Sequence, residues 1–217
     1  MNSNLGIIAS VTSAGTYTSA TAPTAAAAGN GAVICVTDLN NSYWRSDGTY
    51  WRPLNGSACI YSSTADSDVI TGGTGEVQVS IASANVAITI PSMVMAPGME
   101  IRQSHSLIKT GTAGTCAQRI RQTNIAGTNL GYTTALGATA IGARASMILA
   151  AGAVSGGNIT LTNVMTGTTT AELGPASTAN VSITQAIASP LVLFPTIQNA
   201  SAADSVIVRS IKVYIRG

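Results

Sequence analysis

Few residues in this sequence have the chemistry that catalysis or metal binding requires. His105 is the only histidine among 217 residues, and Asp and Glu together number eight. A lone histidine cannot supply the usual cluster of imidazole ligands, and a catalytic triad would need a nucleophile and an acid that no motif identifies. We therefore expect His105 to be a hydrogen-bonded core or subunit-contact residue, and we predict no metal site and no cofactor.

The carboxylates give little support to catalysis. Asp66 and Asp68 have a spacing that could touch a cation, but two exposed carboxylates in a linker more often only solvate it. Glycoside hydrolysis needs two positioned carboxyl groups. Glu76, Glu100 and Glu172 fall on different expected strands or loops. We predict that the chain is not an enzyme, and a glycan-active enzyme is the less favoured alternative.

Arginines and glycines offer weak signals for ligand binding. Arg102, Arg119 and Arg121 could anchor an acidic sugar, or pair with carboxylates between subunits. The Gly-rich segments 72–75 and 111–114 match neither a dinucleotide-binding motif nor a phosphate loop, so they are predicted to be turns.

The segment 37–56 carries the strongest local pattern. Trp44 and Trp51, the two tryptophans of the protein, lie on either side of Asp47-Gly48. Asp-Gly between two aromatic, β-prone runs indicates a hairpin, because glycine adopts a positive φ at no steric cost. Pro53 then ends the second strand.

Four aromatic residues of this hairpin are candidate contacts with a glycan or a protein partner: Tyr43, Trp44, Tyr50 and Trp51. Aromatic rings of this kind can stack on sugars. Two indoles more often form the whole hydrophobic core of so small a unit, and the sequence leaves both interpretations open.

The composition excludes several classes of protein. Charged residues make up 8%, against roughly 25% in an average soluble protein. The net charge of +2 and the scattered basic residues do not favour nucleic acid. No apolar run approaches the ~20 residues of a membrane-spanning helix, so we expect no membrane insertion. So few charges offer little repulsion between copies, and an obligate oligomer is predicted.

The cysteines and the start of the sequence indicate where the chain folds. Three cysteines, an odd number, show no Cys-x-x-Cys spacing. The first residues lack the basic start and apolar stretch of a secretory signal. We expect three reduced thiols in a chain that folds in a cytoplasm.

Alternating hydrophobic residues from position 76 onward predict eight or nine strands separated by Gly-rich turns. The expected fold is all-β: a small N-terminal β-hairpin module followed by a jelly-roll or β-sandwich domain. The predicted divisions are an extended attachment arm (1–32), the Trp-containing module (33–61), a linker around one short strand (62–75) and the trimerising jelly roll (76–217).

The strand predicted at 99–110 has polar residues on its apolar face. Gln103 and His105 share a face with Ile101 and Leu107. Buried polar groups without partners are costly. A threefold axis would let three copies of each side chain bond one another, so Gln103 and His105 are predicted trimer contacts.

The hairpin resembles a module of tailed-bacteriophage fibre and receptor-binding proteins. In that module, a strand ending in Val-Thr-Asp leads to an aromatic–Ser–(Asp/Asn)–Gly–Thr–x–Trp–x–Pro hairpin. The matching residues are Val36-Thr37-Asp38, Trp44-Arg45-Ser46-Asp47-Gly48-Thr49 and Trp51-Arg52-Pro53.

The rest of the chain resembles, more loosely, the trimeric C-terminal jelly roll of many such proteins. The matching features are Ile90-Pro91, Gly98, the strand at 99–110 with Lys109-Thr110, Gln118-Arg119-Ile120-Arg121, Arg144 and the strand at 205–216.

The resemblance implies a structural component of a bacteriophage virion. The expected form is a homotrimeric tail fibre, spike or receptor-binding appendage that docks through its N-terminal part. Its partners would be other virion proteins of the tail, baseplate or capsid, together with host surface glycan. The alternative is a capsid decoration protein, either a cement protein or a head fibre. In each case the location is the virion, assembled in the cytoplasm of the host bacterium.

Overall fold

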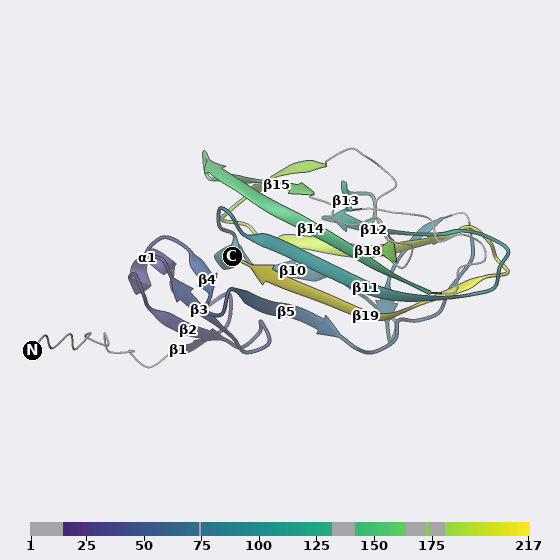
Figure 1. Ribbon diagram of the computed structural model, residues 1–217, viewed down its shortest axis with the longest axis horizontal. Helices are drawn as coiled ribbons and strands as arrows, with labels where there is room; N and C mark the ends of the chain where they lie inside the picture. Colours follow the sequence, from purple (N-terminus) through teal and green to yellow (C-terminus); the bar gives the residue numbers. More distant parts are fainter. Residues whose placement is uncertain (1–14, 74, 132–141, 164–171, 174–180) are drawn as a thin grey trace, which may run out of the picture.

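The computed structural model of the chain is almost entirely β (Figure 1). It describes residues 15–73, 75–131, 142–163, 172–173 and 181–217. A small four-stranded module lies at one end of the molecule, and a larger two-sheet sandwich of the jelly-roll kind makes up the rest (Figure 1). The predicted fold class is confirmed, whereas the trimer stays a prediction.

The module is one sheet with the strand order β1-β2-β3-β4. Its strands are β1 (Gly15–Tyr17), β2 (Val33–Val36), β3 (Ser42–Ser46) and β4 (Trp51–Pro53). The predicted hairpin is confirmed, because Ser46 pairs with Trp51 across the turn. Gly48 in that turn has φ +94°, in the region that favours glycine.

A single helical turn, α1 (Ala25–Ala28), packs against this sheet. Thr24 caps it by accepting a hydrogen bond from the Ala27 amide. Ala25 is buried, and its carbonyl accepts a hydrogen bond from Ser46 Oγ at 2.8 Å. The expected extended arm is therefore wrong for residues 15–32, because small alanine side chains let this segment fold back onto its own module. Residues 1–14 lie outside the described residues.

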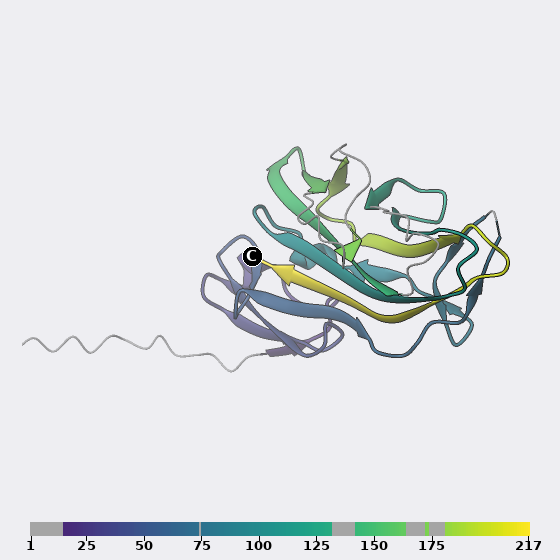
Figure 2. The same cartoon turned by 45° about the vertical axis from the view of Figure 1, so that its right-hand side comes forward.

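The sandwich consists of an eight-stranded and a five-stranded sheet, seen as two layers in Figure 2. The first contains β5 (Ser57–Ser63), β6 (Ile70–Thr71), β11 (Glu100–Thr110), β14 (Gly142–Ser155), β15 (Asn158–Asn163), β16 (Glu172–Leu173), β17 (Ser182–Ala186) and β19 (Ser205–Arg216). The second contains β7 (Glu76–Gln78), β10 (Ile88–Ile90), β12 (Cys116–Gln122), β13 (Asn129–Gly131) and β18 (Leu191–Asn199). A short hairpin, β8 (Ser80–Ile81) with β9 (Ala84–Asn85), and a 3₁₀ turn, η1 (Ser92–Val94), complete the elements.

Period-two alternation places the core between the two sheets. On the central strand β11, every second residue from Ile101 to Lys109 is buried. On β18 of the opposite sheet, Leu191, Leu193 and Ile197 are buried in the same way. Complete burial of such aliphatic side chains contributes roughly 1.5–3 kcal/mol each.

The strand β5 leaves the module and enters the sandwich. It pairs with β19 along its length, rather than returning to the hairpin sheet. The hairpin sheet therefore ends at Pro53, earlier than the boundary at residue 61 that we expected. Within the predicted linker, β6 also pairs with β19.

Hydrogen bonds from Arg52 and Asn40 tie the module to the sandwich. Arg52 Nη1 donates to the Pro97 carbonyl at 2.7 Å, and Asn40 Nδ2 donates to the Cys59 carbonyl at 3.3 Å. The chain ends beside this junction (Figure 1), where the Gly217 amide donates to the Gly56 carbonyl. The module is thus held against one end of the sandwich.

The three cysteines are free thiols, as predicted. Cys35 and Cys116 are buried, and Cys59 is half-buried. Burial raises the pKa of Cys116 to about 11, so its thiol stays protonated at neutral pH.

Candidate functional site

The two indoles form the core of the module. Trp44 has no exposed surface and Trp51 only 2%. Their ring N–H groups are satisfied inside the chain: Trp44 Nε1 donates to Ser42 Oγ at 2.7 Å, and Trp51 Nε1 donates to the Pro23 carbonyl at 2.9 Å. These rings therefore have no face available for stacking on a sugar, and the prediction of glycan contact is wrong for both indoles.

The two tyrosines lie closer to solvent. The side chain of Tyr43 is 51% exposed. Tyr50 is half-buried, and the Arg52 guanidinium lies 5.7 Å from its ring centroid, within the range of a cation–π contact. Of the four predicted contact residues, only the tyrosines remain candidates.

Asp47 organises the turn of the hairpin. Its Oδ1 accepts hydrogen bonds from the Thr49 and Tyr50 amides, and its Oδ2 accepts one from Arg52 Nε at 3.0 Å. Burial alone would raise the pKa of Asp47, but these hydrogen bonds and the Arg52 charge lower it overall. The ionised carboxylate fixes both the turn and the Arg52 side chain.

Arg45 and Arg52 lie directly opposite each other on β3 and β4. The Arg52 side chain donates hydrogen bonds to Asp47 and to the Pro97 carbonyl. Arg45 is exposed, and no ion pair or hydrogen bond joins its side chain to the described residues. A cleft of about 400 Å³ is lined by Arg45 and Arg52 together with Asn30, Asp47 and Leu54. With Asp47 paired to Arg52, the hairpin exposes one uncompensated positive charge, that of Arg45.

Gln103 and His105 lie inside the sandwich, on the inner face of β11. Each is 2% exposed within a single chain. Gln103 Nε2 and His105 Nε2 are 2.6 Å apart in a mutual hydrogen bond, while Gln103 Oε1 and His105 Nδ1 have no partner. Burial lowers the pKa of His105 to about 3, so the ring is neutral at physiological pH.

This burial changes the argument for a trimer contact. We expected Gln103 and His105 at a subunit interface because two polar side chains need partners. Within one chain they share one hydrogen bond in the interior of the sandwich, while one polar atom of each side chain still lacks a partner. Their place at a threefold axis stays a prediction, and their burial between the two sheets gives it no added support.

The arginines considered for sugar binding have partners inside the chain. Arg119 Nη1 and Arg121 Nη2 lie 3.0 and 2.6 Å from Glu76 Oε2. Thr196 also donates a hydrogen bond to Glu76. Although burial alone would raise the pKa of Glu76, these contacts lower it. Arg102 pairs in the same way with its neighbour on the strand, Glu100.

The two carboxylates of the predicted linker, Asp66 and Asp68, have different partners. Asp66 lies 3.2 Å from Arg209, and Asp68 accepts hydrogen bonds from Ser80 Oγ and the Ser83 amide. Among the residues that the structure describes, no group of three or more His, Cys, Asp or Glu side chains could hold a metal ion. None of the helices in the described ranges is long and apolar enough to cross a membrane.

One buried ion pair was not predicted from the sequence. Lys109 Nζ lies 2.8 Å from Asp204 Oδ2, and neither side chain has any exposed surface. The sequence did indicate that Lys109 is buried, because it continues the alternation that buries Leu107 and His105. A lysine at such a position requires a carboxylate nearby, but the alternation does not say which one.

Comparisons with known proteins add little. No protein-family model matches the chain, and no curated protein matches it. The CBM2 module of an evolved Dit protein of Lactobacillus casei BL23 phage J-1 is similar over 74% of this chain and 96% of that chain, at 9% identity and a TM-score of 0.33. A structure of infectious bursal disease virus, Gx strain, is similar over 74% of this chain and 42% of that chain, at 12% identity and a TM-score of 0.23. Neither similarity is large enough to carry a functional assignment.

Proposed function

We propose that the chain is a structural component of a bacteriophage virion: a homotrimeric tail fibre, spike or receptor-binding appendage that docks through its N-terminal module. The supporting observation is the hairpin itself. Its Asp47-Gly48 turn and buried indoles form the compact unit that the fibre-like motif implies, followed by a jelly-roll-like sandwich in the expected order.

A non-enzymatic role fits the state of the carboxylates. A glycosidase needs one protonated carboxyl group and one free carboxylate on either side of the scissile bond. Glu76 is held ionised between two arginines, and Glu100 is paired with Arg102. The side chain of Glu172 lies outside the described residues. Release of reducing sugar from host polysaccharide would contradict this part of the proposal.

The low charge of the chain supports the trimer. Charged residues make up 8% of the sequence, so copies repel one another little. The outer face of the larger sheet is mixed: Ser104, Ser106 and the 39% exposed Ile108 of β11 lie beside Lys212 of β19, which is opposite Ser104. Light scattering of the purified protein should give about three times the 21.8 kDa of one chain. A monomer at micromolar concentration would contradict the trimer.

The deciding experiment is to locate the protein on intact particles. Gold-labelled antibodies against the chain should decorate the tail or baseplate of purified phage in electron micrographs. Label distributed over the head would favour the alternative, a capsid decoration protein. Particles without label, from a lysate in which the protein is detected, would overturn the virion proposal. The free thiols agree with assembly in a reducing bacterial cytoplasm.

A further inference from the structure

The outer face of the hairpin exposes residues of the kinds that anchor protein interfaces. Tyr43 and Arg45 alternate with the buried residues of β3, Arg52 lies opposite Arg45, and the Leu54 amide donates to the Tyr43 carbonyl at 2.9 Å. Tyr43 is 51% and Leu54 43% exposed. These four residues, Tyr43, Arg45, Arg52 and Leu54, are called the hairpin face below.

The charge on the hairpin face is incompletely neutralised. Like charges directly opposite each other on neighbouring strands destabilise a sheet. Asp47 neutralises Arg52, whereas Arg45 has no carboxylate within reach among the described residues. Asp47 and the Pro97 carbonyl hold the Arg52 side chain in place, so its guanidinium N–H groups are already positioned. A carboxylate in the cleft beside both guanidinium groups would remove the repulsion.

A second copy of this chain has little acidic charge to offer. Among the described carboxylates, five are paired with cations inside the chain: Asp47 with Arg52, Asp66 with Arg209, Glu76 with Arg119 and Arg121, Glu100 with Arg102, and Asp204 with Lys109. Asp38 and Asp68 accept hydrogen bonds from neutral groups, so each keeps one uncompensated charge. Charge complementarity therefore favours a molecule more acidic than a second copy.

We infer that the hairpin face docks an acidic segment of another virion protein, with Arg45 as the central contact. This inference rests on the proposed function and names the surface through which the module attaches. Tyrosine and arginine are enriched in protein interfaces, and exposed Leu54 adds an apolar contact beside them. An acidic protein segment is thus favoured over a glycan.

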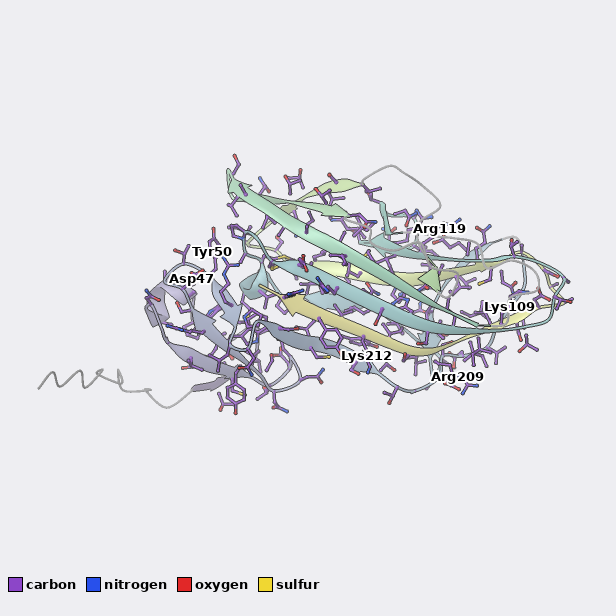
Figure 3. All side chains as sticks on the ribbon, in the orientation of Figure 1. Asp47, Tyr50, Lys109, Arg119, Arg209 and Lys212 are labelled. Carbon is purple, nitrogen blue, oxygen red and sulfur yellow. The ribbon has the colours of Figure 1, made fainter. Side chains whose placement is uncertain are left out.

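The chemistry of the face is tested with purified protein and defined probes. Calorimetry at low ionic strength should show that a hexaglutamate peptide binds the parent chain, and that Arg45→Gln weakens binding at least about tenfold. Lys212→Gln removes one positive charge from β19, away from the module (Figure 3), and should leave the affinity within about twofold. Absence of peptide binding, or equal losses in both variants, would overturn the inference. Tighter, Arg45-dependent binding of hexagalacturonate would also overturn it, by making the face a glycan site.

Attachment is tested on particles that carry variant chains. Arg45→Glu should lower the amount of the chain per purified particle at least about tenfold by immunoblot, while folded protein accumulates in the lysate. Lys212→Glu, the matched charge reversal, should be incorporated like the parent. Arg45→Gln controls for a folding defect: its melting temperature should equal that of the parent chain, while its incorporation into particles should still fall. Parental incorporation of both Arg45 variants would overturn the docking surface. A parent chain missing from particles would instead overturn the proposed function.

Discussion

Two cation–carboxylate pairs lie at opposite ends of the molecule, and they differ in how far they are buried. Lys109 lies at the far end of the sandwich from Asp47 and Tyr50 (Figure 3). The Lys109–Asp204 pair is completely buried, whereas the side chains of Arg52 and Asp47 are 29% and 38% exposed. The buried pair holds loops together. The exposed pair leaves neighbouring positive charge available to another molecule.

The buried pair has further hydrogen-bond partners. Asp204 also accepts hydrogen bonds from the Ala113 and Gly114 amides, and Lys109 donates to the Gly111 carbonyl at 2.8 Å. Lys109 and these amides lower the pKa of Asp204. The loop after β11 is thereby fixed to the loop before β19. This end of the sandwich is held by a buried ion pair, whereas the ion pair at the module end is partly exposed.

The largest expected effect comes from breaking the buried pair. Lys109→Ala leaves the buried Asp204 carboxylate without its cation, and should lower the free energy of unfolding by about 3–5 kcal/mol. Urea denaturation followed by circular dichroism measures the change. The matched control is Arg209→Ala, because the Arg209–Asp66 pair is about half exposed. That variant should lose no more than about 1 kcal/mol. Similar losses of stability in the two variants would show that the buried pair contributes no more than the exposed one.

The second effect is a pH dependence caused by His105. Burial lowers its pKa to about 3 in the folded chain, from the ordinary value of 6.5. The unfolded chain therefore binds more protons below pH 6.5, and stability present above that pH is lost as the pH falls toward 3. Between pH 6.5 and 4.5 the free energy of unfolding should fall by about 2–3 kcal/mol. Denaturation midpoints across this range measure the loss.

The control for this prediction replaces both partners of the buried hydrogen bond. Gln103→Leu combined with His105→Leu removes the titrating ring and its amide together, so no new unpaired group is created. The double variant should lose less than about 1 kcal/mol between pH 6.5 and pH 4.5, because only carboxylates with a lowered pKa, such as Glu76, then begin to take up protons on unfolding. An unchanged slope would show that another group titrates, and that the interior around His105 admits water.

A smaller effect is expected in the core of the module. Trp51→Phe keeps an aromatic ring but removes the indole N–H that holds the Pro23 carbonyl. The loss should be about 1–2 kcal/mol, from one hydrogen bond and a small cavity. Hydrogen exchange followed by mass spectrometry should show faster exchange in residues 15–28 and little change in β11. Equal effects in both regions would mean that module and sandwich unfold together.

The smallest effect on stability is expected at the exposed pair, where binding should respond instead. Asp47→Asn keeps an oxygen for the Thr49 and Tyr50 amides but removes the charge facing Arg52. Stability should change by less than about 1 kcal/mol. Calorimetry should show tighter hexaglutamate binding, because the hairpin face becomes more positive. Weaker binding would mean that Asp47 matters more for positioning the Arg52 side chain than as a competitor of the peptide for it.

Local patterns predicted much of this structure. The Asp47-Gly48 turn, the strands from residue 76 onward and the inward direction of Gln103 and His105 all follow from alternation and turn chemistry. The interpretation of the indoles as module core, which the sequence left beside stacking on sugars, is the correct one.

Properties that depend on distant pairing were not predictable. Nothing local in residues 57–63 shows that β5 pairs with β19, because the partner lies at the other end of the chain. The partners of Lys109 and Glu76 come from loops and strands far away in the sequence. The excess charge of the hairpin face appears only when the register places Arg45 opposite Arg52.

The position of β19 has a consequence for the order of events during synthesis. This strand fills the place between β11 and β5, so both earlier strands keep an open edge until residues 205–216 have left the ribosome. Pairing over such sequence distances is slow, and exposed apolar edges invite association between nascent chains. A ribosome stalled before residue 205 would therefore carry an incomplete sandwich that is prone to aggregate.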